Sequence, residues 1–288
     1  MDKTWKTVTA KRHLFDFKVK ELYDYRDLIF LFVKRTFVSR YKQTILGPLW
    51  AIIQPLLTTV IFTVVFGSLA GLTISDSYSN MDIFIPEFVF YLSGTICWAY
   101  FSGCLTETSN TFITNSAIMG KVYFPRLVMP ISTIFSQLIS FIIQFAMFFV
   151  IWGYYVLRGT TDIQIKTTIL LAPLLVLQIG ILGMGFGTII SSLTTKYRDL
   201  AMLVTFGVQL WQYATPVAYG IGLIPEKYAF WYLLNPMSSI IVTFRYAFFG
   251  TGYFDLVTYG ISWITTIVVL IISVLLFNRV ERTFMDTI

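Results

Sequence analysis

The chain has 288 residues, of which 56% are hydrophobic and only 12% are charged, and its mean hydropathy is +0.73. A soluble domain usually carries about 25% charged residues, so this composition excludes an ordinary water-soluble fold and indicates an all-α integral membrane protein. The formal net charge of +6 does not indicate nucleic-acid binding, because the basic residues flank apolar segments, where membrane lipids and insertion orientation account for them.

Residues 1–46 form a basic amino-terminal segment with eleven Lys and Arg and no apolar core of the kind found in a cleavable signal peptide. The positive-inside rule therefore predicts that this end is cytoplasmic. Apolar side chains recur there at helical spacing, which predicts an amphipathic helix in the membrane interface. Its apolar residues are Leu22, Tyr25, Ile29, Phe32, Val33, Phe37 and Tyr41.

The first apolar segment, residues 46–72, has no ionisable residue and exceeds the roughly 20 residues that a membrane-spanning helix needs. We expect residues 40–42 to end the interfacial helix, and Gly47 and Pro48 to redirect the chain into the membrane. This segment begins a six-span transmembrane domain, residues 47–288.

Five further charge-free segments are long enough to cross: residues 88–106, 127–157, 167–195, 200–222 and 256–278. Alternating six spans from a cytoplasmic start places 17 of the 21 Lys and Arg inside and four outside, namely Arg158, Lys166, Lys227 and Arg245. This topology puts both termini in the cytoplasm.

Between the fifth and sixth spans, residues 220–255 contain apolar runs too short to cross, interrupted by Pro and Gly. We expect two short re-entrant or interfacial helices there on the outer side. Irregular backbone at that depth requires cover by protein or a wet cavity.

The sequence offers no catalytic or metal site. Acidic residues avoid the interiors of the predicted spans, and the single histidine lies in the amino-terminal segment. Cys97 and Cys104 share one apolar segment without metal-ligand spacing, and we expect them to pack as small buried side chains. The glycines at 180, 183, 185 and 187 predict close packing between helices.

Polar and aromatic residues within spans indicate a translocation path. Amides, hydroxyls and aromatic faces suit a sugar, which has hydroxyl edges and CH faces, although packing between helices and interfacial aromatic belts would explain the same residues. The candidates are Gln54, Thr58, Phe62 and Phe66 in the first span, and Phe206, Gln209, Trp211, Tyr213 and Tyr219 in and after the fifth.

Five strings occur in the order found in one known family: RYKQTILGPLWAIIQPLL (40–57), KVYFPRLVMPIS (121–132), KYRDLAMLV (196–204), WQYATPVAYG (211–220) and LNPMSSIIVTFRYAFFG (234–250). The chain thereby resembles the membrane subunit of bacterial polysaccharide ABC exporters. These are the Wzm-like O-antigen and capsule permeases and the related teichoic acid exporters.

The resemblance implies a homodimeric permease in the bacterial inner membrane, docked on two copies of a cytoplasmic ATPase that carries ATP and Mg. The cargo would be a polysaccharide on undecaprenyl diphosphate. The short helices within residues 220–255 would form an outer gate, with Pro216, Pro225, Asn235, Pro236 and Arg245 as candidates.

The resemblance also implies that the first inner loop, residues 107–126, couples the permease to the ATPase. The candidates are Glu107, Lys121, Tyr123, Pro125 and Arg126, although Lys121 and Arg126 also fit positive-inside anchors. An ion-coupled flippase or a membrane lipid transferase would need intramembrane carboxylates or clustered acid and base groups, which the sequence lacks.

Overall fold

The computed structural model describes residues 19–42, 44–71, 85–111, 114–115, 118, 124–159, 163, 166–194, 200–250 and 252–283. Within these ranges every regular element is helical, so the all-α fold is confirmed. In chain order the elements are α1 (Val19–Asp24), α2 (Arg26–Tyr41), η1 (Gly47–Leu49), α3 (Trp50–Phe62), η2 (Thr63–Leu69), α4 (Glu87–Ser109), α6 (Val128–Arg158), η3 (Thr167–Leu171), α7 (Ala172–Thr194), α8 (Leu200–Tyr213), η4 (Ile221–Leu223), α9 (Glu226–Leu233), α10 (Pro236–Phe249) and α11 (Leu256–Thr283).

Five helical stretches in the described part of the chain are long and apolar enough to cross a membrane: Gly47–Leu69, Glu87–Ser109, Val128–Arg158, Thr167–Thr194 and Leu256–Phe277. They coincide within a few residues with five of the six predicted spans. The protein is therefore a multi-pass membrane protein, as its composition indicated.

The remaining predicted span, residues 200–222, is only partly helical. Helix α8 has 14 residues, which makes it about 21 Å long, whereas the hydrocarbon core of a bilayer is about 30 Å thick. The chain then forms turns up to Gly220, because Pro216 lacks an N–H group and disfavours helical backbone at Thr215.

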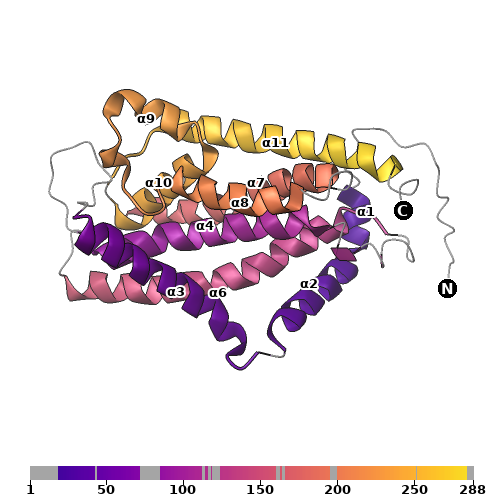
Figure 1. Cartoon of the computed structure of the whole chain (residues 1–288), viewed down its shortest axis with the longest axis horizontal. Coiled ribbons are helices and arrows are strands. Elements are labelled where there is room, and N and C mark those ends of the chain that lie inside the picture. The colour runs from indigo at the N-terminus through magenta and orange to yellow at the C-terminus, as the bar shows by residue number, and fades with distance from the viewer. Residues whose placement is uncertain are drawn as a thin grey trace.

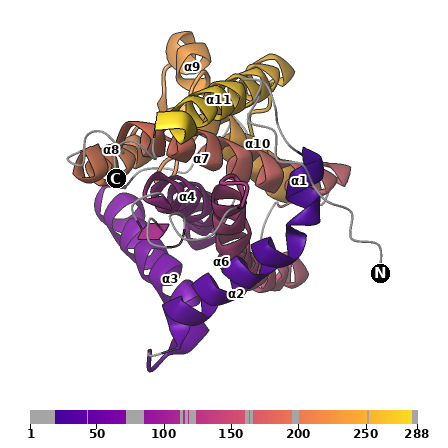
Figure 2. The same cartoon turned by 90° about the vertical axis from the view of Figure 1, so that its right-hand side faces the viewer.

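Helix α4 is the centre of the bundle (Figures 1 and 2). It packs most extensively against α7 and α6 and also contacts α3, α8 and α10. Nearly four-fifths of its spanning window is buried, against about one-fifth of the first span. The side chains between Val89 and Phe101 are almost all apolar or small, which suits a helix surrounded by other helices on every side.

The glycines of α7 allow this close packing. A Cβ atom at Gly183 would lie 2.7 Å from Cβ of Cys104, and one at Gly187 would lie 2.7 Å from the carbonyl oxygen of Leu105. A Cβ at Gly185 would lie 2.7 Å from a methyl group of Val269 in α11. The prediction that these glycines serve helix packing is confirmed.

Helices α1 and α2 occupy the amino-terminal segment, whereas the amphipathic, interfacial character expected of this segment stays a prediction. Its buried Phe32 joins Phe124, Val128 and Met129 at the start of α6 and Phe277 of α11 in a separate apolar cluster. The chain leaves α2 at Tyr41 and turns at Gly47, whose φ of 52° favours glycine. Figure 1 shows α2 and α3 meeting at an angle at this turn.

Two short helices, α9 and α10, occupy the region predicted to contain them. They gather at the end of the bundle opposite to α1 (Figure 1). We call these ends the α9 end and the α1 end. Asn235 caps α10 by accepting a hydrogen bond from the Met237 backbone N–H at 3.2 Å, and Pro236 occupies the first turn. Almost every residue of α10 is buried.

Candidate functional site

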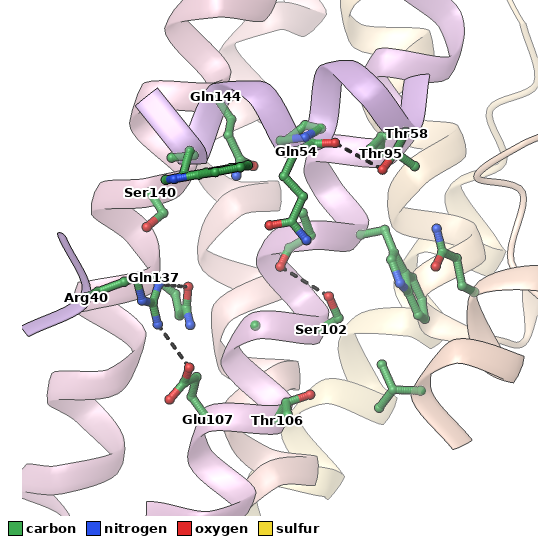
Figure 3. A pocket seen from close by; sticks show the side chains of 18 of the residues that line it. Arg40, Gln54, Thr58, Thr95, Ser102, Thr106, Glu107, Gln137, Ser140 and Gln144 are labelled. Atoms are coloured by element: carbon green, nitrogen blue, oxygen red, sulfur yellow. Dashed lines mark hydrogen bonds and ion pairs between the residues drawn. The ribbon is translucent and has the colours of Figure 1, made fainter. Parts of the chain in front are cut away.

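A polar cavity of about 680 Å³, open on one side, lies between the helices of the bundle. It is bounded by α3, α4, α6 and α8, with the end of α2 at its edge. Figure 3 shows side chains from these helices converging on it. Its polar lining residues are Arg40, Tyr41, Gln54, Thr58, Thr95, Ser102, Thr106, Glu107, Gln137, Ser140, Gln144, Gln209 and Gln212.

Helical spacing explains why these side chains converge. On α6, Gln137, Ser140 and Gln144 follow i, i+3 and i+7, which places them on one face of the helix. On α3, Gln54 and Thr58 are one turn apart. The lining of α4 extends from Thr95 to Glu107, about 18 Å along the axis, so the cavity covers more than half of this helix.

Several hydroxyl groups of the cavity donate to the backbone of their own helix. Thr95 Oγ1 donates to the carbonyl of Tyr91 at 2.8 Å, and Thr58 Oγ1 donates to that of Gln54 at 3.1 Å. These bonds hold the hydroxyl oxygens in place and leave their lone pairs as acceptors.

Two tryptophans complete the lining. Trp98 of α4 is 4% exposed, whereas Trp50 at the start of α3 is 47% exposed. Indole rings provide flat apolar surface beside the amides and hydroxyls. The cavity therefore combines hydrogen-bonding groups with aromatic faces.

One ion pair lies at the edge of the cavity nearest the α1 end. Arg40 Nη2 lies 3.0 Å from Glu107 Oε1, and Arg40 Nη1 donates to Gln137 Oε1 at 3.2 Å (Figure 3). These contacts join α2, α4 and α6. Among the described residues that line the cavity, Arg40 and Glu107 are the only Lys, Arg, Asp or Glu, and their formal charges cancel.

The structure brings three of the candidate path residues together in this cavity: Gln54, Thr58 and Gln209. Phe62 and Phe66 lie further along the first span, where Phe62 is 8% exposed and packs against Tyr91 with ring centroids 6.5 Å apart. Phe206 is 60% exposed on α8. These three aromatic residues are outside the lining of the cavity.

Trp211 has a packing environment of its own. Its ring lies 5.1 Å from that of Phe101 and 5.2 Å from that of Phe186, and it also contacts Trp98. Its Nε1 donates to Oδ1 of Asn235 at 3.2 Å. Trp211 therefore connects the end of α8 to the start of α10, directly behind the cavity wall that Trp98 forms.

The remaining path candidates lie in and after the end of α8. Tyr213 is 61% exposed. The hydroxyl of Tyr219 contacts both the Tyr213 carbonyl, at 2.9 Å, and the hydroxyl of Tyr232 in α9. This pair of tyrosines links the turn after α8 to α9.

Arg245 is the centre of the candidate outer gate. Its side chain has 0% exposure. The guanidinium donates to the carbonyl oxygens of Val217 at 2.9 Å and Tyr219 at 3.2 Å, and to Ser93 Oγ at 3.3 Å. It also lies 3.6 Å from the ring centroid of Phe90. Arg245 thus joins α10, the turn after α8 and α4.

The other gate candidates differ in their surroundings. Pro216 and Pro236 are buried, and Pro225 is exposed before α9. Asn235 donates its amide to Thr215 Oγ1 at 3.1 Å in addition to capping α10. Four of the five gate candidates, all except Pro225, thus lie in or beside the contact between α10 and the turn after α8.

The coupling candidates are only partly described. Glu107 belongs to the cavity, as above. Pro125 and Arg126 are buried just before α6. Lys121 and Tyr123 lie outside the described residues.

Sequence reasoning missed most of the cavity wall formed by α4 and α6. Gln137, Ser140 and Gln144 show an i, i+3, i+7 pattern that would have identified them, because three polar residues share one face of an apolar span. In the described part of the chain, no group of three or more His, Cys, Asp or Glu could hold a metal ion.

Comparison with known proteins gives one family and three relatives. Residues 27–249 match the family described as ABC-2 type transporter. The chain is 28% identical over 262 residues, 90% of its length and 94% of the relative, to the O-antigen export system permease protein RfbA of Klebsiella pneumoniae. A second Klebsiella pneumoniae protein of the same name is 27% identical over 261 residues. The protein of that name from Myxococcus xanthus is 27% identical over 234 residues, 80% of this chain and 84% of the relative.

Proposed function

Since the chain belongs to the ABC-2 type transporter family, we propose that it is the permease subunit of an ATP-driven exporter of lipid-linked polysaccharide in the bacterial inner membrane. The family match and relatives confirm the resemblance seen in the five sequence strings. The cargo is proposed to be an O-antigen or a similar polymer on undecaprenyl diphosphate, because the relatives are O-antigen export permeases by name.

The cavity is the observation that carries the proposal. Polar groups within a membrane-spanning bundle are costly to bury and usually serve a substrate path. Here five glutamines, several hydroxyls and two indoles converge in one space, and each kind of group recognises a different part of a sugar. Packing alone would not require so many amides at one place.

We propose a six-pass topology with both termini in the cytoplasm. The α1 end would face the cytoplasm, because the basic residues cluster there in the sequence. Helix α8 would rise from that side to about mid-membrane, and the turns with α9 and α10 would complete the crossing and form the gate. The buried position of α10 supports this arrangement, since short helices at membrane depth need protein cover.

We propose that two copies of the chain assemble along α3 and α8. Only about one-fifth of the first span's window is buried within the chain, and Gln54 and Gln209 are exposed on these two helices. Glutamine side chains facing lipid would be unfavourable, so a second copy would cover them and enclose the path. The amino-terminal helix α2 would lie in the membrane interface beside it.

The energy would come from a separate cytoplasmic ATPase subunit that carries ATP and Mg, docked near residues 107–126. A lone ion-coupled flippase is the weaker alternative. In the five membrane-crossing stretches the acidic residues, Glu87 and Glu107, lie at helix ends, whereas ion coupling usually needs acids within the membrane. A teichoic acid exporter would share the architecture and differ in its cargo.

The test is depletion of this chain in its native cell. We expect an undecaprenyl-diphosphate-linked glycan to accumulate on the cytoplasmic side, detected by mass spectrometry of extracted lipids, and a plasmid copy of the chain to reverse the accumulation. An unchanged lipid-linked glycan pool after depletion would contradict the proposal. Co-purification of a nucleotide-binding subunit with the tagged chain would separate the exporter from a lone flippase.

A further inference from the structure

We infer that the cavity accepts uncharged sugar repeats and discriminates against acidic ones. This inference rests on the proposed export function and concerns the charge of the glycan, which that function leaves open. It applies to the sugar chain that passes through the bundle and not to the diphosphate of the lipid.

The described charged residues of the cavity lining compensate each other. Arg40 and Glu107 lie 3.0 Å apart and compensate each other, and the other polar lining side chains are amides and hydroxyls. A second copy of the chain would add the same residues and the same zero sum. A carboxylate or phosphate entering this space would find no uncompensated cation among the described lining residues, and burying such a charge costs far more than burying a hydroxyl.

The hydrogen-bonding capacity is the second argument. Each of Gln54, Gln137, Gln144, Gln209 and Gln212 offers both donors and an acceptor, which matches a sugar hydroxyl that also donates and accepts. Gln144 is 8% exposed, and its Oε1 has no hydrogen-bond partner in the described part of the chain. An unsatisfied buried carbonyl is unfavourable, and a sugar O–H reaching this amide would satisfy it.

The aromatic faces are the third argument. Trp50 and Trp98 border the same space, and the CH faces of neutral pyranose rings pack on indole without any charge being desolvated. The two rings stand beside the amides, so one sugar unit can contact both kinds of group.

The basic residues next to the cavity do not change the sum of charges in its lining. Arg35 lines a separate hollow of about 310 Å³ between α2, α4 and α6, together with Ser39, Thr111 and Ser136. Arg40, Glu107 and Gln137 border both spaces, so the ion pair separates the uncharged cavity from the basic surface of α2.

The first experiment measures export in cells that lack the native permease and express this chain with its ATPase subunit. Two lipid-linked polymers of similar length are supplied by their biosynthetic genes, one with only neutral hexoses and one with a uronic acid in each repeat. We expect the neutral polymer to reach the surface at least about tenfold more efficiently, normalised to its lipid-linked pool.

The outcomes separate the two proposals. Equal export of both polymers would overturn the inference and leave the proposed function standing. Export that does not depend on this chain for either polymer would overturn the proposed function itself.

A matched pair of variants tests whether this cavity is responsible. Gln209 lines the cavity from α8 and is exposed within a single copy of the chain, so Gln209→Lys and Gln209→Glu place opposite charges in the cavity wall without disturbing the packing inside that copy. We expect the ratio of acidic to neutral polymer exported to rise in Gln209→Lys and to fall in Gln209→Glu. A ratio that stays the same in both variants, with both present in the membrane at normal levels, would overturn the assignment of selectivity to this cavity.

Binding is measured without transport in the full-length chain reconstituted in nanodiscs. Neutral maltohexaose should change the tryptophan fluorescence saturably, and hexagalacturonate should require roughly tenfold more sugar. The signal should shrink in Trp50→Phe. Equal or tighter binding of the acidic hexamer, or binding of neither sugar, would contradict the inference.

Discussion

Arg245 is a charged residue buried inside the helical bundle, and its contacts explain why it is stable there. Its guanidinium has three hydrogen-bond partners from two parts of the chain and the face of Phe90. The guanidinium reaches these partners with three separate nitrogens held in one plane, whereas a lysine would have to reach them from a single nitrogen at the end of its chain. Arg245 is therefore a structural cross-link between α10, α4 and the turn after α8.

We predict that Arg245→Lys lowers the stability of the purified chain by roughly 2 to 4 kcal/mol, because the carbonyls of Val217 and Tyr219 lose a bidentate partner. Thermal unfolding in detergent, followed by size-exclusion chromatography, measures the effect. The control is Arg158→Lys at the exposed end of α6, where the guanidinium lies over Tyr154. Equal melting temperatures for the two variants would contradict the role of Arg245.

We predict that the double variant Gln54→Ala and Gln209→Ala reduces polymer export about tenfold or more while assembly with the ATPase subunit is retained. Each change removes donors and acceptors from the cavity wall, and both residues are exposed, so the fold should tolerate them. Export is measured as surface polymer, and assembly as co-purified ATPase. Ile267→Ala on the exposed face of α11 is the control. Full export by the double variant would exclude these amides from the path.

At the scale of elements, the contact between α4 and α7 depends on backbone proximity. Gly183 faces Cys104 and Phe101, and Gly187 faces Leu105 and Thr108. Small residues at such positions let two membrane helices approach closely, and association then gains from van der Waals contact along their length.

We predict that Gly183→Val destabilises the chain by about 2 kcal/mol or more, because the added atoms would overlap the α4 backbone. Gly260→Ala in α11 is the control, since a Cβ there meets nothing within 4 Å. Melting of the two purified variants, compared with the parent chain, checks this. The packing model would be refuted by a Gly183→Val protein as stable as Gly260→Ala.

The sequence predicted the long helices well and the half-length α8 poorly, for a physical reason. Length and absence of charge identify residues that tolerate hydrocarbon, but they do not show where the backbone stops being helical. The string after Tyr213 remains apolar and so extended the predicted span. The end of α8 is visible only in the folded chain, where Arg245 and Asn235 bind the turn that follows this helix.

The cavity was predicted in part. Gln54, Thr58 and Gln209 were predicted because they are polar residues within spans. The amides on α6 have the same property but were not predicted. No sequence pattern indicated that Arg40 would reach Glu107 across 67 positions. Such a contact depends on the angle between α2 and α3, which is a property of the folded chain.

At the scale of the whole molecule, the weakly buried first span and α8 lie at the left of the bundle in Figure 2, and α11 lies at its top. Exposed apolar side chains continue along α8 at Met202, Leu203, Phe206 and Leu210. This side is where the proposed second copy would bind.

We predict that a cysteine at Phe206 forms a dimer on mild oxidation in membranes, because the proposed interface would bring two α8 helices near each other. Cys97 and Cys104 are fully buried and should not contribute. A cysteine at Ile264, exposed on α11, is the control. Non-reducing gels give the readout. Cross-linking at Ile264 but not at Phe206 would contradict the proposed interface along α3 and α8.

The burial of Arg245 also has a consequence for biosynthesis. A guanidinium on an isolated apolar helix inserts poorly into a bilayer, so α10 cannot take its place as an independent segment. Its partners Phe90 and Ser93 belong to α4, which leaves the ribosome about 150 residues earlier. We therefore expect α10 to reach its buried position only after α4 is already in the membrane.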